Sequence, residues 1–155
     1  MNFLNWLGET PLATGIAEST WLFPAVEVVH VFAISLVFGT IAIIDLRLLG
    51  FGVQEQPIAA VAHDAERWLV RGLAVMITTG ILLFMCFATK YYYLTFFWVK
   101  MASLLVVIVF TWSVHRRVAM AGDADVRPVW RKFVALMSLL LWTTVAVGGR
   151  YIGFP

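Results

Sequence analysis

The chain has 155 residues, of which 62% are hydrophobic and only 13% are charged, and its formal net charge is +2. A soluble domain of this length cannot bury so much apolar surface. The single cysteine, Cys86, excludes an intrachain disulfide and a cage of cysteine ligands around a metal. We therefore expect one integral membrane domain over residues 1–155, with the lipid bilayer as its partner and no nucleic acid.

The first segment, residues 1–19, is neutral to acidic and mildly amphipathic. It lacks the basic stretch that opens a cleavable signal peptide. We expect this segment to lie along the membrane interface.

Four long apolar blocks follow, each close to or above the roughly 20 residues that a helix needs to cross a bilayer. The blocks are Trp21 to Gly50, Trp68 to Thr89, Phe96 to Val118 and Trp130 to Gly148. Short connections favour antiparallel neighbours, so the predicted fold is all-α, an integral membrane four-helix bundle running up-down-up-down. Small residues offer surfaces for close helix contact and lead us to expect a homo-oligomer; they are Ser35 with Gly39, and Gly148 with Gly149.

Arginine and lysine are unevenly distributed between the connections. Most follow the first and third blocks: Arg47, Arg67, Arg71, Arg116, Arg117, Arg127, Arg131 and Lys132. The opposite side has only Lys90, Lys100 and Arg150. Because basic residues stay on the cytoplasmic side of a membrane, we expect a multi-pass protein of the bacterial inner membrane with both termini periplasmic.

Glu27 and His30 lie three residues apart in the first block, on one face of a helix. At about 1.5 Å per residue they lie roughly 9 and 14 Å deep, with Lys100 near the depth of Glu27 and Thr79 near that of His30. Ionisable groups at such depths are costly unless they pair, bind a cofactor or line a cavity. This layer is the first candidate site.

A second group of polar residues lies at the cytoplasmic ends of the helices. Its members are Asp45, Arg47, His63, Asp64, Arg67, Arg71, His115, Arg116 and Arg117. We expect the arginines to bind lipid headgroups. Asp45 is expected to form an ion pair with Arg47 at the membrane interface, and His63 to lie on the surface of an amphipathic turn. For His115 two interpretations stay open: a residue at a helix end, or a ligand whose neighbouring arginines hold anionic propionates.

Haem suits these residues better than other metal chemistry. A di-iron carboxylate site needs a second Glu-x-x-His motif, and a zinc protease needs His-Glu-x-x-His; the sequence has neither. An apolar bundle with a buried histidine and aromatic walls can enclose a porphyrin. The second ligand stays open. If His30 binds the iron, the second ligand is Met101, Lys100, water or a residue of a second copy. At the cytoplasmic ends of the helices, His63 and His115 can instead bind one iron together.

The stretches "ESTWLFPAVEVVHVFAISLVFGTIAIIDLRLLG", "TTGILLF", "FFWVK" and "SVHRR" resemble an uncharacterised family of bacterial four-helix inner-membrane proteins. That family is similar in layout to the copper-resistance D proteins and, more remotely, to four-helix b-type cytochromes. The resemblance implies a membrane bundle that binds haem b, with His30 and His115 carried over as metal ligands. Paired histidines within one helix, which a two-haem arrangement requires, are absent from the sequence.

We therefore expect a haem b protein that passes electrons between the quinone pool and a partner protein, possessing quinol-linked redox activity if it is an enzyme. His30 is the expected axial ligand, and Glu27 orients it by a hydrogen bond or carries a proton. Lys100 and Arg150 balance Glu27 or a propionate. The alternative is a cofactor-free accessory or transport protein, in which Glu27, His30 and Lys100 form a buried network that holds the bundle or conducts a proton or metal ion.

Overall fold

The computed structural model describes residues 2–52, 56–121 and 126–152, without the side chains of residues 2 and 150–152. The described residues contain helices and no strand. Four helical spans are long and apolar enough to cross a membrane. They are α3 (Leu22–Leu49), α4 (Ile58–Cys86), a third span made of α6 (Thr95–Phe110), the π-helical turn η1 (Thr111–His115) and α7 (Arg116–Met120), and α8 (Pro128–Ile152). The prediction of an all-α four-helix membrane protein is confirmed.

The ends of the spans follow from local sequence. Gly50 ends α3 in the left-handed conformation, with φ of 95°, which glycine adopts without steric cost. Its N–H and that of Phe51 bond carbonyls of the last turn of α3, at 3.1 and 2.8 Å. Helix α4 begins at Ile58, before the apolar block that starts at Trp68, because the amphipathic stretch after Pro57 continues into that block as one helix. Pro128 opens α8, where a proline is tolerated because its missing N–H has no partner in the first turn.

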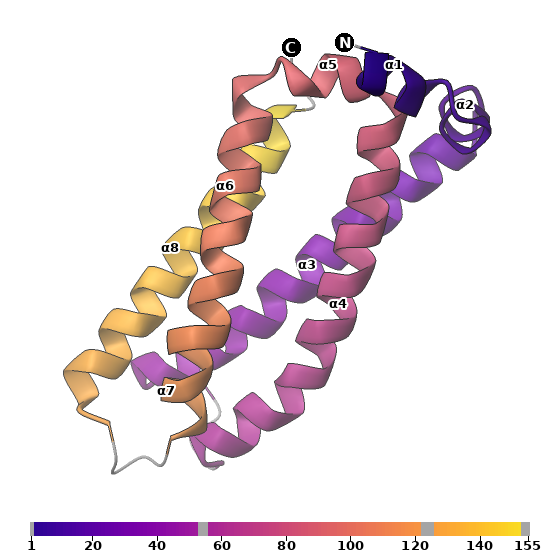
Figure 1. The fold of residues 1–155 in the computed structure, drawn as a ribbon. Coiled ribbons are helices and arrows are strands. Elements are labelled where there is room, and N and C mark those ends of the chain that lie inside the picture. Colours follow the sequence, from indigo (N-terminus) through magenta and orange to yellow (C-terminus); the bar gives the residue numbers. More distant parts are fainter. Residues whose placement is uncertain (1, 53–55, 122–125, 153–155) are drawn as a thin grey trace.

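The four spans alternate in direction and pack in the order α4, α3, α8, α6 (Figure 1). We call one end of the bundle the terminal end; α1 (Asn2–Gly8), α2 (Pro11–Ala17) and α5 (Ala88–Tyr92) lie there. The other is the arginine end, where α7 packs against the first half of α4. Towards the terminal end α4 and α6 diverge, so the bundle is more closed at the arginine end.

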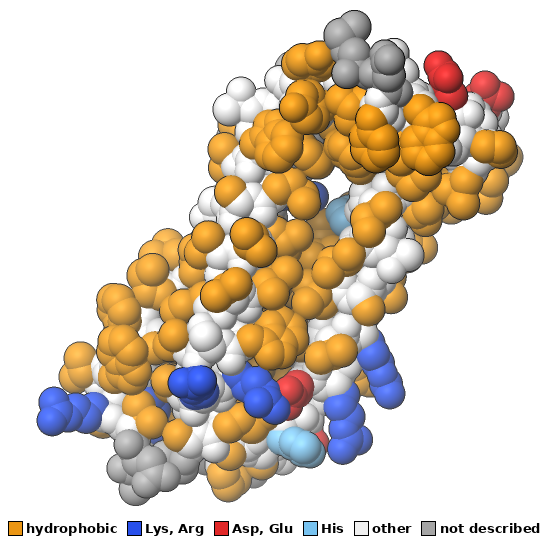
Figure 2. Space-filling model, viewed as in Figure 1, with side chains coloured by type: hydrophobic (Ala, Val, Ile, Leu, Met, Phe, Trp, Pro, Cys, Tyr) orange, Lys and Arg blue, Asp and Glu red, His pale blue; other side chains and the backbone are white. Residues whose placement is uncertain are grey.

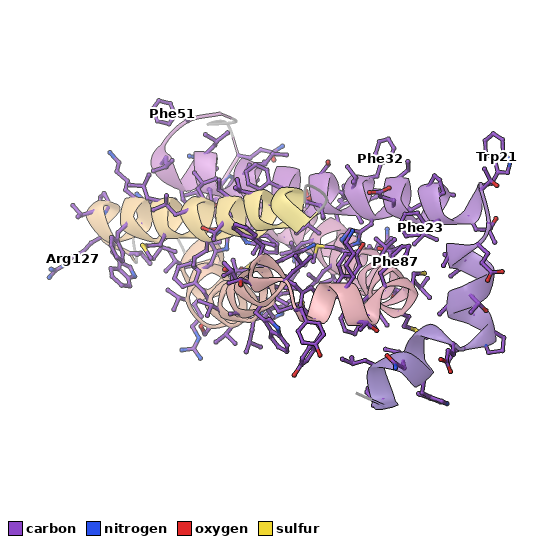
Figure 3. All side chains as sticks on the ribbon, turned by 90° about the horizontal axis from the view of Figure 1, so that it is seen from above. Trp21, Phe23, Phe32, Phe51, Phe87 and Arg127 are labelled. Carbon is purple, nitrogen blue, oxygen red and sulfur yellow. The ribbon has the colours of Figure 1, made fainter. Side chains whose placement is uncertain are left out.

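Short helices cover part of the terminal end. Helices α1 and α2 pack against α5 and against the adjoining ends of α3 and α4. Seen from above, they extend sideways from the bundle (Figure 3). An interfacial position for residues 1–19 stays a prediction.

Apolar side chains fill the interior and also cover the outside. Two buried clusters occupy the core: one includes Val37, Ile41 and Trp142, and the other, nearer the arginine end, includes Ile44 and Val134. Figure 2 shows hydrophobic side chains over most of the visible surface, with Lys and Arg gathered at the arginine end. Such a surface requires an apolar solvent, so the chain is a multi-pass membrane protein in a lipid bilayer.

Close contact between α3 and α4 depends on Gly72. A Cβ built there would lie 2.9 Å from Cγ2 of Val37, which is tighter than real Cβ contacts. At Gly39 the structure shows no such contact within the chain, since a Cβ there meets nothing within 4 Å; a contact of this glycine with a second copy stays a prediction. Gly148 and Gly149 do lie at a helix contact, against Lys100 of α6.

Candidate functional site

His30 is held in the bundle by Thr79 of α4. The His30 Nδ1 atom lies 2.8 Å from Thr79 Oγ1, and both residues are buried. The threonine hydroxyl donates its hydrogen to the carbonyl of Val75, at 2.7 Å, so it accepts from the imidazole. The network therefore places the hydrogen of neutral His30 on Nδ1 and leaves the lone pair on Nε2.

Gly80 provides the space for the His30 ring. A Cβ at Gly80 would lie 3.2 Å from His30 Cε1, so any larger residue would push the ring away. The backbone carbonyl of Met76 also faces the imidazole, which again favours an N–H on that side. Residues from less than two turns of α4 thus fix the position and the tautomer of one histidine.

Lys100 approaches His30 from α6. Its half-buried side chain is close enough to interact electrostatically with the imidazole. Its Nζ would lie 3.3 Å from a Cβ at Gly149, so the absence of a side chain there makes room for it. The ion pairs found in the described part of the chain involve other residues. A cation at this depth suits an anionic group of a ligand.

Aromatic rings cover the terminal-end side of this layer. Phe84 of α4 stacks on Phe97 of α6 with centroids 5.1 Å apart, and Phe87 meets Tyr91 and Phe23 edge to face. Figure 3 shows Phe23 and Phe87 turned towards each other, whereas Trp21 and Phe32 project away from the bundle. Below the rings, Figure 2 shows an opening between α4 and α6 with histidine and basic side chains in its wall. We call the part of the bundle that holds His30, Thr79, Gly80, Lys100, Phe84 and Phe97 the His30 compartment.

Glu27 lies outside this compartment. Its side chain is exposed, and its electrostatic neighbour is Tyr91 of α5. Burial, and then the carboxylate of Glu27 and the thiol of Cys86, raise the pKa of the Tyr91 phenol. The structure therefore brings Lys100 to His30 but turns Glu27 towards the surface. Arg150 lies in α8, and its side chain is outside the described part of the structure.

At the arginine end, His115 pairs with Asp45. Nε2 of His115 lies 2.7 Å from Oδ1 of Asp45, and the two side chains are 2% and 0% exposed. The predicted pair of Asp45 with Arg47 is wrong, because Asp45 points into the core while Arg47 donates from Nε and Nη2 to the carbonyl of Gln56, at 3.2 and 2.8 Å. His63 is exposed on the first turns of α4.

His30 and His115 belong to different layers. From His30 to Asp45, the partner of His115, α3 advances fifteen residues, which is roughly 22 Å along the helix axis. One metal or one haem iron therefore cannot bind both histidines. The arginines beside His115 have other contacts as well, since Arg116 donates to Glu66 at 2.7 Å.

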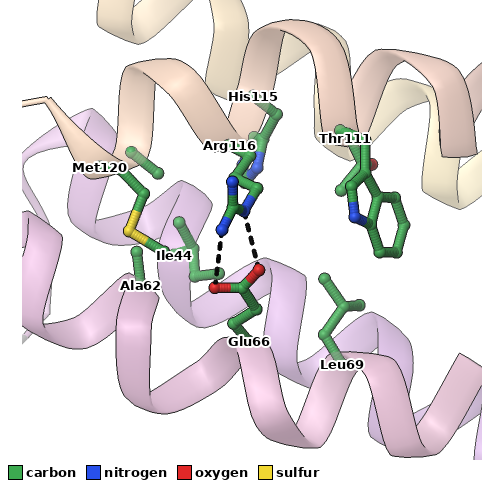
Figure 4. Close-up of a pocket in the computed structure, with 10 residues that line it drawn as sticks. Ile44, Ala62, Glu66, Leu69, Thr111, His115, Arg116 and Met120 are labelled. Atoms are coloured by element: carbon green, nitrogen blue, oxygen red, sulfur yellow. Dashed lines mark hydrogen bonds and ion pairs between the residues drawn. The ribbon is translucent and has the colours of Figure 1, made fainter.

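A pocket lies between α4 and the third span, on the surface side of His115 (Figure 4). Its lining includes Leu69, Thr111 and His115, and the ion pair of Glu66 with Arg116 spans it. In the described ranges, no group of three or more His, Cys, Asp or Glu side chains is placed to hold a metal ion.

The sequence model of a Family of unknown function (DUF6644) matches residues 2–155. The chain belongs to this family. Among curated proteins and among solved structures, no significant match is found. An uncharacterised family of four-helix membrane proteins is thus supported, whereas the comparisons give no link to copper-resistance D proteins or to b-type cytochromes.

The sequence interpretation missed three buried polar residues on the helices around the Asp45–His115 pair: Thr111, Ser138 and Trp142. Two signals were present. Asp45 interrupts an apolar run before the helix ends, and Ser138 lies inside the last apolar block. A buried carboxylate in such a run requires a partner from a neighbouring helix, but the sequence does not say which helix supplies it.

Proposed function

We propose that this chain is a membrane haem b protein that passes electrons between a quinone and a partner protein, with His30 as an axial ligand. The observation that carries the proposal is the hydrogen bond from His30 Nδ1 to Thr79, which leaves Nε2 as the nitrogen able to bind iron. Histidines that bind metals generally donate their other ring N–H to a fixed acceptor of this kind.

The residues around His30 suit a porphyrin. Gly80 lets the imidazole lie directly against α4, and Phe84 and Phe97 offer flat apolar faces. Lys100 is placed to bind a propionate. When bound, haem b supplies one-electron transfer at its iron. The protein's part is to fix the imidazole through Thr79, to exclude water with the aromatic rings and to neutralise the acid group with Lys100.

The second iron ligand stays open among Met101, Lys100, water and a second copy of the chain. Met101 is 43% exposed on α6, so its side chain faces away from the core. A homo-oligomer therefore remains part of the proposal, because a neighbouring copy is one source of a ligand or of a wall.

Absorption spectroscopy tests the haem proposal. The full chain, expressed with ample haem and purified in a mild detergent, is expected to show a Soret band. His30→Ala should abolish or sharply reduce the band while the protein stays in the membrane, since α3 remains apolar. His63→Ala is the matched control, because His63 is exposed, and it should retain the band. A wild-type protein without a Soret band, or a band that survives His30→Ala, would contradict the proposal.

The proposed orientation places the arginine end in the cytoplasm of a bacterium and both termini in the periplasm. It is supported by the arginines gathered at that end. Quinone then reaches the His30 compartment from the periplasmic half of the bilayer. A reporter fused after Pro155 should behave as periplasmic and one inserted at Asp123 as cytoplasmic; the opposite pattern would reverse the assignment.

The cofactor-free alternative has weaker support. It requires Glu27, His30 and Lys100 to form one buried network, and Glu27 is exposed beside Tyr91. The contact of His30 with Lys100 remains compatible with it. A colourless protein that folds normally would favour this alternative.

A further inference from the structure

The proposed haem site makes no use of the Asp45–His115 pair. Both side chains are almost completely buried, and they come from helices that are far apart in the sequence. His115 lies in a π-helical turn, a rare feature that is frequent at functional sites. A buried ionisable pair in a membrane bundle calls for an explanation.

Buried polar atoms without hydrogen-bond partners lie on Asp45 itself and on the helices around the pair. Within the described residues, these include Asp45 Oδ2, Thr111 Oγ1, Ser138 Oγ and Trp142 Nε1, each on a side chain at least nine-tenths buried. The hydroxyl of Ser138 faces the Asp45 carboxylate without the geometry of a full hydrogen bond. On α8, Trp142 lies about one turn from Ser138. On η1, Thr111 likewise lies about one turn from His115.

The short distance between Asp45 and His115 requires a hydrogen. Two lone pairs at 2.7 Å would repel, so a hydrogen lies between Oδ1 and Nε2. With neutral His115 donating to ionised Asp45, the pair carries one net negative charge. One added proton makes the pair neutral overall, and Asp45 Oδ2 is an unpartnered atom that can accept it. In an apolar interior the neutral state avoids the cost of an uncompensated charge.

The pocket in Figure 4 is the candidate route between this pair and water. It is lined by His115 and Thr111 and lies where α7 packs against α4 at the arginine end. The ion pair of Arg116 with Glu66 spans the pocket near the surface, with side chains 52% and 27% exposed. Exposed ion pairs of this type are weak, so this one can open readily.

We propose that Asp45 and His115 form a proton-binding site, which exchanges one proton with water at the arginine end through this pocket. The proton comes from water outside, binds to the pair and returns by the same route. Thr111 and Ser138 carry hydroxyl groups that can pass it along. This site is independent of haem.

Charged groups on the helices around the pair have contacts of their own. Glu66 of α4 and Arg116 of α7 line the same pocket as His115 and are paired with each other. On α8, Arg131 lies seven residues before Ser138 and is engaged in an interaction of its own. On α3, Arg47 is bound to the Gln56 carbonyl. None of these forms a hydrogen bond with Asp45 in the described structure, so the proton equilibrium belongs to the pair.

Two spectroscopic signals of the full chain in lipid nanodiscs test the site. The chain has only three histidines, so ¹⁵N-histidine NMR with single variants can assign each imidazole. Infrared difference spectra report whether Asp45 is protonated. When the pH falls from about 8 to about 5, the pair as a whole should take up about one proton, seen at His115, at Asp45 or at both. Asp45→Asn should remove the aspartate signal and change the pH response of the His115 signal, with the exposed His63 as the reference imidazole in the same spectra.

Two results would overturn the proposal. One is a pair whose His115 and Asp45 signals stay constant over this range, which would make it a fixed structural contact. The other is a signal that follows the sodium concentration at constant pH, which would make the occupant a metal cation. If Asp45→Asn does not fold, Ser138→Ala provides the second test, because it leaves the pair itself intact and should still shift the wild-type transition.

The entrance has its own test. Glu66→Gln removes the ion pair across the pocket, so deuterium should replace the His115 imidazole hydrogen several-fold faster, with the proton equilibrium little changed. Arg117→Gln is the matched control, since Arg117 is exposed and is not the partner of Glu66. Equal exchange rates in both variants would exclude this pocket as the route.

Discussion

Thr78 and Thr79 offer a matched test of the His30 compartment. Both hydroxyl groups bond the carbonyl four residues earlier in α4, at 2.9 and 2.7 Å. Only Thr79 also accepts from His30, at 2.8 Å. Replacing either by valine removes the same bond within the helix and preserves the branched shape. The difference between Thr79→Val and Thr78→Val therefore isolates the contact with the histidine.

The expected size of this difference follows from burial. Thr79→Val leaves the N–H of His30 buried without its acceptor, which costs about 1–3 kcal/mol of the free energy of unfolding. Thr78 is exposed, so Thr78→Val should change that free energy little. If haem binds, losing the group that orients the ligand should weaken haem binding by about 10- to 100-fold. Thr79→Ser should restore both quantities towards wild type.

Two assays measure these quantities. Unfolding in mixed micelles with increasing denaturing detergent gives the difference in stability, and titration with haem followed at the Soret band gives the affinity. Equal effects of Thr78→Val and Thr79→Val in both assays would refute the reasoning, because the hydrogen bond to His30 would then contribute nothing. If Thr79→Val loses stability but the wild-type protein binds no haem, the hydrogen bond between His30 and Thr79 is supported, and its proposed role in orienting a haem ligand is not.

Further predictions concern packing and ionisation. Gly72→Ala should lower the free energy of unfolding by up to about 2 kcal/mol, since crowding against buried Val37 costs about 1–3 kcal/mol and exceeds the helix gain. Gly39→Ala, which points into open space, should instead stabilise by about 0.5–1 kcal/mol; denaturing-detergent titrations compare the two. Glu27→Gln should lower the pKa of Tyr91 towards its ordinary value, because one of the causes that raise it is removed. Phenolate absorbance, measured against Tyr91→Phe, would show no such change if Glu27 lay elsewhere.

From the sequence, the depth of a residue in the membrane was easier to predict than the side of its helix on which it lies. Counting residues from the block ends placed Thr79 at the depth of His30, and the two are in contact. Depth follows from the length of the apolar blocks and the fixed rise of a helix. The bounds of α3 were predicted to within a residue, since Trp21 and Gly50 flank it.

Rotation was harder because the lipid-facing side is as apolar as the core. In a soluble helix the polar face marks the outside, but here hydrophobic residues are found on every side. Glu27 and His30 were therefore placed on one face, whereas Glu27 is exposed and His30 is buried. For the same reason Asp45 was assigned to its neighbour Arg47 rather than to His115, which is distant in the sequence.

The π-helical turn could not be predicted from composition. It inserts an extra residue into the backbone pattern of the third span between Thr111 and His115. Without this turn, the side chains after Thr111 would point in other directions around the helix axis. The identity of the residues thus limits which chemistry is possible, while the backbone irregularity determines where His115 points.

The two candidate sites share helices α3 and α4 but no side chain. His30 with Thr79 lies in the half of the bundle where α4 and α6 diverge, and His115 with Asp45 lies where α7 closes against α4. Their separation of roughly 22 Å along α3 is a large part of the roughly 30 Å hydrocarbon core. A proton bound at one site therefore makes no direct contact with the groups of the other. If both proposals hold, each site would exchange with its own end of the bundle, and electron transfer at His30 would be kept apart from proton binding at Asp45.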